Sequence, residues 1–420
     1  MRFLSWWLLG LLSLSLIGCS AAKKLAVNNS PKSIENAVPE SLQFEPNPNE
    51  KWIAWQFAQP LPELDEEWRA MLLDPFNESQ ISRVKGKDEF QKKVHDWLSL
   101  KPVDNELTFD ETIDAVSQTV NLLILSAEAA TAQKDAEMAF ERLKTADDWL
   151  NQSLGNATDL RAKTLTASRL QLWEAIARFS ENPASAKDQR NELLKLVQAS
   201  PILTEMRGLI RRDYATETVA RFQALMSAKD PAKTIVTTLA GDIDPEPYVD
   251  SLVKLLQSKE HPLNGPESIK LSSSWIERLA EPNLTVEQWD DLVEEREANS
   301  TAEFKSLKAN PDQELKIADQ PNSVGRLIAY EFTQDAFTAL KWAVYQHVQR
   351  DSYAVRINHA INGNYDLAKD LRAPITNEPY EVDMTTKLLK MKFPSKSQPL
   401  EYTKMLLETG AAEFAKPSAN

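Results

Sequence analysis

The residue types most often used in catalysis are sparse in this chain of 420 residues. Four histidines, His95, His261, His347 and His359, are scattered along it, and none belongs to an HExxH zinc motif. The sequence also lacks a Gly-x-Ser-x-Gly nucleophile elbow, a P-loop and a Gly-x-Gly-x-x-Gly phosphate loop. We therefore expect each histidine to have a structural or surface role.

Acidic residues offer two further kinds of chemistry. Asp242, Asp244 and Glu246 alternate and could bind Ca²⁺, but Pro245 and Pro247 flank them and the spacing is not that of an EF-hand. A pair of carboxylates could also act as in a glycosidase, although the 62 acidic residues allow many pairings and the sequence selects none. We expect neither a bound metal nor a cofactor.

One basic cluster, Arg207, Arg211 and Arg212, lies on a face of an expected helix. It could hold an acidic partner, but acidic residues are abundant nearby, which favours ion pairs within the chain. With 48 basic and 62 acidic residues the net charge is −14, so nucleic acid is not an expected partner. Acidic runs such as 65–67 and 294–297 are expected to be exposed.

Cysteine chemistry is confined to Cys19, the only cysteine in the chain. Arg2 and the apolar stretch 3–16 are typical of a signal peptide, because the stretch is too short to span a bilayer. The run from Leu16 to Cys19, Leu-Ile-Gly-Cys, resembles the lipobox of bacterial lipoproteins. That resemblance implies cleavage between Gly18 and Cys19 and acylation of Cys19. In Gram-negative members of the class, Ser20 in place of aspartate implies sorting to the outer membrane.

Residues 20–48 are polar and contain four prolines, which indicates a flexible tether between the acylated cysteine and the folded body. Because the chain is acidic, anionic lipid head groups would repel it, and the acyl chains must hold it at the membrane. Trp52, Trp55 and Phe57 follow the tether. They either pack onto the body as its first ordered element or contact a partner or the membrane interface.

A glycine count of 10 in 420 residues favours helices joined by polar or proline-bearing loops. One helical face is marked by apolar residues spaced three and four apart, namely Ile113, Val116, Val120, Ile124 and Ala127. Further helices are expected at 186–199, 202–227, 247–257, 267–280 and 286–297. We expect a mainly α fold, an irregular helical bundle or α-array, with a helical body over residues 49–320.

The last hundred residues, 321–420, have a different pattern. Ser323 is a suitable N-cap for a long helix, and Gly363 is a suitable residue to end it. Apolar residues then alternate in two short runs that predict a β-hairpin: Tyr380, Val382 and Met384, followed by Leu389, Met391 and Phe393.

This C-terminal arrangement resembles that of the major pseudopilins of type II secretion and the end module of many uncharacterised helical exported proteins. The matching residues are Gly363, Tyr365, Pro374, Thr376, Pro379 and Tyr380. The sequence departs from that pattern at Asp366, Ala373 and Asn377. A lipobox also stands where a pseudopilin would have its prepilin cleavage site, so the resemblance implies a helix-plus-hairpin module and not pilus assembly.

These observations predict an outer-membrane lipoprotein that faces the periplasm and binds or scaffolds a protein partner of the cell envelope without catalysis. Two alternatives stay open. The body could be an envelope hydrolase with acidic residues in a groove between helices, or it could carry an apolar ligand in an enclosed cavity.

Overall fold

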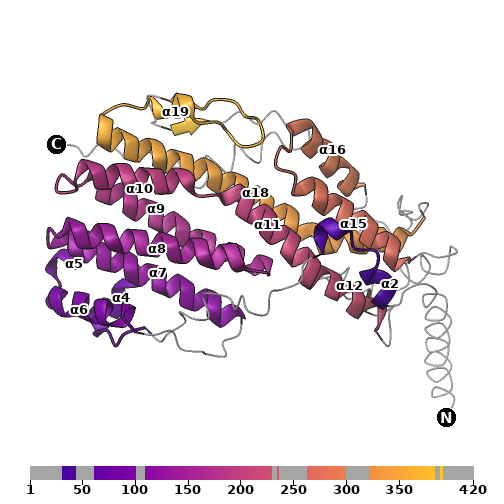
Figure 1. Ribbon diagram of the computed structural model, residues 1–420, viewed down its shortest axis with the longest axis horizontal. Helices are drawn as coiled ribbons and strands as arrows, with labels where there is room; N and C mark the ends of the chain where they lie inside the picture. Colours follow the sequence, from indigo (N-terminus) through magenta and orange to yellow (C-terminus); the bar gives the residue numbers. More distant parts are fainter. Residues whose placement is uncertain are drawn as a thin grey trace, which may run out of the picture. The chain divides into compact units, whose positions relative to one another are not determined.

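The computed structural model describes residues 31–43, 61–100, 109–228, 234–235, 263–298, 321–383 and 388–390 (Figure 1). The described chain is mainly α-helical, as the sequence predicts, and its strands form one short hairpin. The lipobox, the aromatic run 52–57, His261, the acidic segment 242–246 and the expected helix 247–257 lie outside the described residues.

The chain divides into two compact units. One comprises Met1–Glu45 and Ile210–Thr338, and the other comprises Pro46–Leu209 and Ala339–Asn420. The boundary at residue 320 that the sequence suggested is not a boundary between these units, because α18 (Ser323–Asn362) contributes residues to both.

The larger unit is built from a succession of helices. Their bounds are α4 (Glu66–Met71), α5 (Glu78–Arg83), α6 (Lys87–Leu98), α7 (Phe109–Ala132), α8 (Ala136–Asn156), η2 (Leu160–Thr164), α9 (Leu165–Glu181), α10 (Lys187–Ala199) and most of α11 (Ile202–Asp213). In Figure 1, α7, α8, α9 and α10 lie side by side, and close backbone approaches join each consecutive pair.

The packing of α7 follows from its apolar spacing. Ile113, Val116, Val120, Ile124 and Ala127 are all buried, so the predicted face is confirmed. Residues 122, 123, 125, 129 and 130 are also buried, which makes α7 the central helix of its unit. A second cluster, formed by Trp68, Phe90, Val94 and Trp97 with parts of α7, covers its other side, where the rings of Trp68 and Phe90 stack at 4.0 Å.

The smaller unit contains α2 (Pro31–Glu35), η1 (Glu40–Leu42), η3 (Tyr214–Thr218), α12 (Val219–Met226), α15 (Gly265–Leu279) and α16 (Val286–Glu297). Here α15 packs on α2, α12 and α16. The capping box that the sequence suggests for α16 is present, because Thr285 and Gln288 each bond the other's backbone N–H.

A π-helical turn, η3, redirects the apolar face along the expected helix 202–227. An uninterrupted α-helix would continue the face of Met206 and Ile210 at residues 217 and 221. The wider turn adds a residue, so Thr218 and Phe222 are buried instead, and Glu217 and Arg221 are exposed.

The run 294–297 was expected to be exposed throughout, and this prediction is wrong for one residue. Arg296 is buried, although the three acidic residues of the run are exposed. Its guanidinium lies 3.9 Å from the Tyr330 ring centre and 4.3 Å from that of Phe337, and it donates to the Tyr330 carbonyl at 3.1 Å. Cation–π contacts and this hydrogen bond offset the cost of burying the charge. The run 65–67 is exposed as predicted.

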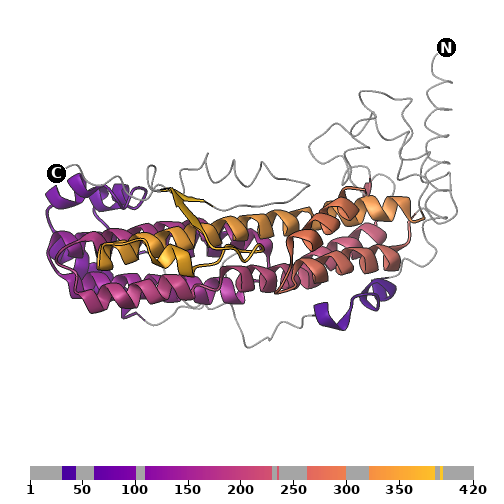
Figure 2. The ribbon, with the colours of Figure 1, turned by 90° about the horizontal axis from the view of Figure 1, so that it is seen from above.

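The C-terminal part has the expected order of elements. After α18 come α19 (Leu367–Asp370), β1 (Glu381–Asp383) and β2 (Leu388–Lys390), and Val382 pairs with Leu389 in the antiparallel register. Figures 1 and 2 show these elements lying along the C-terminal part of α18. None of the described helices combines the length and apolar character that a membrane span requires.

Candidate functional site

The C-terminal motif begins where α18 ends. Gly363 has a φ of 72°, and its N–H donates to the His359 carbonyl at 2.8 Å, so glycine ends the helix in the left-handed conformation as expected. The Tyr365 ring then stacks on the His359 ring with centroids 4.4 Å apart. These contacts fix the direction in which the chain leaves α18.

The segment 372–380 forms a compact turn. Ala373 N donates to the Glu378 carbonyl at 2.8 Å, Asn377 N donates to the Ala373 carbonyl at 2.9 Å, and Arg372 pairs with Pro379 in an isolated bridge. Asn377 has a φ of 55° at the position where the pseudopilin pattern has glycine. Asparagine tolerates the left-handed region better than other residues with a side chain, so the turn forms without that glycine.

The turn places Tyr380 in contact with the buried carboxylate of Asp351. The Tyr380 hydroxyl donates to Asp351 Oδ2 at 2.8 Å, and Pro374 is buried beneath the turn while Pro379 is exposed. Asp351 lies on α18 with only 1% of its side chain exposed. Of the predicted motif residues, Tyr380 thus contacts a carboxylate that sequence reasoning did not single out, while Gly363 and Tyr365 contact His359.

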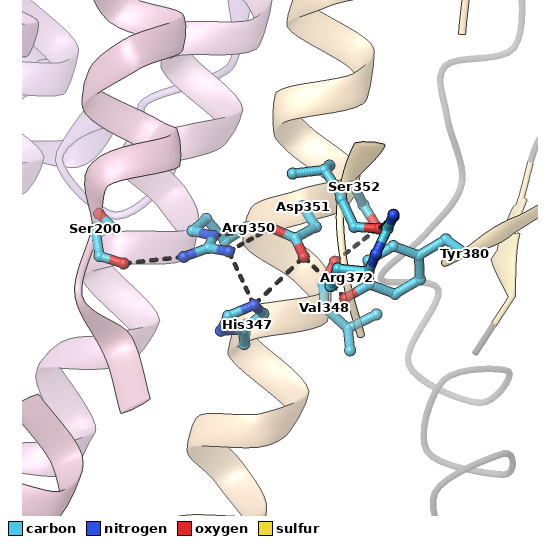
Figure 3. A network of polar contacts seen from close by, with 9 residues as sticks. Ser200, His347, Val348, Arg350, Asp351, Ser352, Arg372 and Tyr380 are labelled. Atoms are coloured by element: carbon cyan, nitrogen blue, oxygen red, sulfur yellow. Dashed lines mark hydrogen bonds and ion pairs between the residues drawn. The ribbon is translucent and has the colours of Figure 1, made fainter. Parts of the chain in front are cut away.

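Two basic side chains complete this polar cluster, as Figure 3 shows. Arg350 Nε and Nη2 donate to Asp351 Oδ1 at 2.9 and 2.6 Å, and Nη1 donates to the Ser200 carbonyl at 3.2 Å. His347 Nε2 lies 3.4 Å from Asp351 Oδ2 and 2.9 Å from Arg350 Nη2. We call Ser200, His347, Arg350, Asp351 and Tyr380 the Asp351 cluster.

Two opposing influences set the charge of Asp351. Burial would raise its pKa, but the hydrogen bond from His347 and the charge of Arg350 outweigh burial and lower the pKa below its ordinary value. Burial and the adjacent carboxylate raise the pKa of Tyr380, so the phenol keeps its proton. Asp351 is therefore an ionised acceptor and Tyr380 a fixed donor.

Ser200, His347 and Asp351 are the residue types of a nucleophilic triad, but their geometry differs from one. Ser200 contributes its backbone carbonyl to Arg350, and its buried hydroxyl has no hydrogen-bond partner. His347 Nε2 faces Arg350 and Asp351, whereas a triad histidine directs this nitrogen to the serine. The Asp351 cluster is therefore a structural clamp between α10, α18 and the C-terminal turn.

In comparisons with known proteins, no protein-family model, no curated protein and no solved structure matches this chain.

A second buried acid lies elsewhere in the same unit. Asp147 on α8 is 2% exposed, and burial raises its pKa to about 6 despite the opposing charge of Arg169. Asn151 Nδ2 donates to Asp147 Oδ2 at 2.8 Å, and Asp147 Oδ1 has no hydrogen-bond partner. Arg169, 1% exposed, donates to Glu205 at 2.6 Å and so joins α9 to α11.

Pockets open from the described surface in each unit. The one between α5, α7 and α9 holds about 260 Å³ and includes Glu128, Arg178 and Asn182 in its lining. The other, in the smaller unit, holds about 490 Å³ and is lined by residues of α12, Thr234 and residues of α18 that include Glu331 and Asp335. Neither is the enclosed apolar cavity that a lipid carrier would need, because both open to solvent and have polar groups in their linings.

The remaining sequence candidates are dispersed. His95 and His359 are exposed, and Arg211 donates to the Ala280 carbonyl at 3.3 Å instead of forming the expected ion pair. Within the described ranges, no group of histidine, cysteine and acidic residues could hold a metal ion.

Sequence reasoning missed Asp351 because an aspartate within a helix has no distinctive pattern. The sequence feature that could have identified Asp351 is its position relative to apolar residues of the same helix. Asp351 follows the apolar residues Val344 and Val348 at helical spacing, and so lies on a buried face.

Proposed function

We propose that this protein is a bacterial lipoprotein of the outer membrane whose helical body faces the periplasm and binds or scaffolds another envelope component. The observation that carries the proposal is the sequence Leu16-Ile17-Gly18-Cys19 after a short apolar segment. The sequence predicted a flexible tether over residues 20–48, but residues 31–43 form α2 and η1 and bury Ile34 and Leu42 in the smaller unit, which corrects that expectation. Residues 20–30 are polar and are the part that we propose as the tether between the anchor and the body.

The polar clusters of the body support the scaffolding part of the proposal. Arg350 and Asp351 join α18 to α10 and the C-terminal turn, Arg169 joins α9 to α11, and Arg356 joins α18 to α9. Buried charges paired in this way hold helices in one register. Trp342 on α18 is 41% exposed, and large aromatic side chains of this kind are enriched in protein interfaces.

The anchoring part is tested by fractionation of cells that express the full chain. We expect the natural chain to stay with outer membranes through a high-salt wash and to incorporate labelled palmitate. Cys19→Ala should remove the label and leave the protein extractable by salt, because only acyl chains hold an acidic body at the membrane. Ser20→Asp is the matched control, since it should keep the label and move the protein to the inner membrane. A Cys19→Ala chain that stays membrane-bound after the salt wash would refute the anchor.

The binding part is tested by site-specific photocrosslinking in intact cells. A crosslinker at Trp342 should capture one defined envelope protein, whereas a crosslinker at the exposed Asp148 serves as the control position. Equal capture of the same set of proteins from both positions would contradict a specific interface at Trp342.

A further inference from the structure

Residues 31–43 form a short segment that is docked on the smaller unit. The segment contains two helical pieces, α2 and η1, of five and three residues. Helices this short do not persist alone in water, so contacts with the rest of the unit hold the segment in this conformation. The backbone of α2 comes close to α12 and α15, and that of η1 comes close to α15 (Figure 1). We call residues 31–43 the strap.

Apolar side chains make the first kind of contact between the strap and the unit. Ile34, Val38 and Leu42 are spaced four residues apart and are 0%, 9% and 2% exposed. Lys32 and Glu35 are exposed. The strap therefore has a buried apolar face and a charged face in water. Burial of the three apolar side chains favours docking, because it removes their surface from water.

Hydrogen bonds from both helical pieces make the second kind of contact. Gln223 Nε2 on α12 donates to Glu35 Oε1 on α2 at 3.1 Å. The Ser41 hydroxyl on η1 donates to the Glu277 carboxylate on α15. Both bonds are exposed, so their main effect is to fix the register in which the strap docks.

Docking of the strap determines how much chain is left to act as a tether. Eleven residues, 20–30, lie between Cys19 and the first residue of the strap. Fully extended, they span at most about 40 Å. A random coil of eleven residues has a root-mean-square end-to-end distance of about 18 Å. With the strap undocked, the tether would comprise residues 20–43, and this distance would be about 27 Å.

We propose that the strap shortens the tether and so holds the smaller unit close to the membrane surface. The inference rests on the proposed lipid anchor at Cys19. The net charge of −14 gives the body no attraction to anionic head groups, so the length of the tether sets its distance from the bilayer. An envelope component that the smaller unit binds must then lie in the same membrane or next to it.

Energy transfer from the smaller unit to lipid tests the proposal. The full chain, labelled with palmitate in cells, is placed in phosphatidylcholine vesicles that contain a lipid with an acceptor dye on its head group. Cys19 is the only cysteine, and the anchor uses its thiol. Lys270→Cys, at an exposed position of α15, therefore takes a single donor dye.

An insertion lengthens the tether while the strap stays docked. Thirteen Gly and Ser residues between Asn29 and Ser30 match the length of the strap. They should increase the root-mean-square distance about 1.5-fold, so we expect less energy transfer than in the chain without the insertion. The insertion leaves every described contact in place, so its result does not depend on how a strap variant folds.

A second variant undocks the strap. Ile34→Asp combined with Leu42→Asp places two carboxylates at buried apolar positions, which should release the strap. Energy transfer should fall as much as with the insertion, because thirteen residues join the tether in both chains. Lys32→Gln, an exposed charge change on α2, is the control and should leave the transfer unchanged.

Each result supports or overturns the proposal. Unchanged transfer in the chain with the insertion would overturn it, because the tether would then not set the position of the smaller unit. Unchanged transfer in the chain with both aspartates would overturn it as well, because the strap would then not limit the tether. A natural chain that neither incorporates palmitate nor floats with the vesicles would refute the anchor and, with it, this inference. That readout is independent of the energy transfer, so the two failures can be told apart.

Discussion

Asn151 bridges two buried and oppositely charged residues: it donates to Asp147 at 2.8 Å and accepts from Arg169 at 2.7 Å. The amide satisfies one oxygen of the aspartate, and the second oxygen stays without a partner. Since Arg169 also pairs with Glu205, the charge of Asp147 is compensated only in part, which is why burial dominates its pKa.

Asp147 makes the stability of the fold depend on pH in an unusual direction. Its folded pKa of about 6 lies above its ordinary value of 3.8, so the folded state binds the proton more tightly than the unfolded state. Its contribution is favourable below pH 3.8 and is lost as the pH rises through 6, by up to about 3 kcal/mol. Asp147→Asn should therefore stabilise the protein at pH 7.5 and have little effect at pH 4, as measured by urea unfolding. Asp96→Asn, an exposed charge change on α6, should change neither value, and a less stable Asp147→Asn protein at pH 7.5 would contradict the prediction.

Replacing Asp351 with asparagine should change the free energy of unfolding in the direction opposite to that expected for Asp147→Asn. Its folded pKa is lowered, so its stabilising contribution is present above pH 3.8 and disappears as the pH falls through the folded pKa. Asp351→Asn should destabilise the protein at pH 7.5, because Arg350 loses its carboxylate partner, and the difference from the natural chain should shrink below pH 3.8. Urea unfolding of the natural chain and of Asp351→Asn at pH 7.5 and at a pH below 3.8 measures this difference in stability. An Asp351→Asn protein that is more stable than the natural chain at pH 7.5 would contradict the prediction.

Tyr380→Phe tests the link between the C-terminal turn and α18. Removing the hydroxyl leaves a buried, ionised oxygen of Asp351 without its donor, which should cost about 1.5–3 kcal/mol of unfolding free energy. Tyr330→Phe is the matched control. The ring of Tyr330 contacts Arg296 but no described residue bonds its hydroxyl, so its loss should cost less than about 0.5 kcal/mol. Equal effects of the two substitutions would show that the Tyr380 hydroxyl does not hold the turn.

Arg356→Lys tests the contact of α18 with α9. Arg356 donates to both oxygens of Glu181, at 2.6 and 2.9 Å, and to Glu174 at 2.7 Å, with 14% of its side chain exposed. Lysine cannot form this fork, so we expect a loss of about 1–2 kcal/mol.

Arg161→Lys provides the exposed counterpart to that test. Arg161 also contacts two carboxylates, those of Asp110 and Asp159, but its side chain is 57% exposed. The loss there should stay below about 0.5 kcal/mol. Denaturant unfolding of both variants decides whether burial gives the Arg356 contact its strength, and equal losses would contradict that account.

Gly325→Ala tests a close approach in the smaller unit. A Cβ at this position of α18 would overlap Asn322 Oδ1 and Ser268 Oγ. These atoms cannot move freely, because Asn322 Oδ1 accepts from the Asn264 N–H at 2.7 Å and Ser268 Oγ donates to the Asn264 carbonyl, also at 2.7 Å. We expect a loss of about 1–3 kcal/mol in thermal or urea unfolding.

Gly155→Ala on α8 is the control for that substitution, since a Cβ there meets no atom within 4 Å. It should stabilise the protein by roughly 0.5–1 kcal/mol, because alanine loses less conformational freedom in a helix. A neutral Gly325→Ala protein would show that Asn322 and Ser268 relax without cost.

The elements that the sequence predicts well share a local cause. The buried face of α7, the capping box at Thr285 and the glycine that ends α18 each depend on residues within a few positions of one another. The β-hairpin was likewise predicted from alternation of apolar residues, and the structure pairs Val382 with Leu389.

The features that the sequence did not predict depend on distant residues. Arg296 belongs to a run of charges, and only the rings of Tyr330 and Phe337 make its burial favourable. The π turn at Tyr214–Thr218 shifts the apolar face by one residue. The sequence pattern shows the apolar stripe passing from Tyr214 to Phe222 and Met226, but it does not identify a π turn as the cause. Arg178 and Glu128 are 50 residues apart in sequence and share a pocket only because α7 and α9 pack together.

The sequence by itself determined where helices begin and end, because hydrogen bonding, capping and apolar spacing act over a few residues. The tertiary structure alone decided which charges are buried beside which partners. Packing of the helices places Asp351 beside Tyr380, and it places Asp147 within reach of the charge of Arg169. Burial then makes the energy of each charge depend strongly on the partners that packing places beside it, as the opposite pKa shifts of Asp147 and Asp351 show.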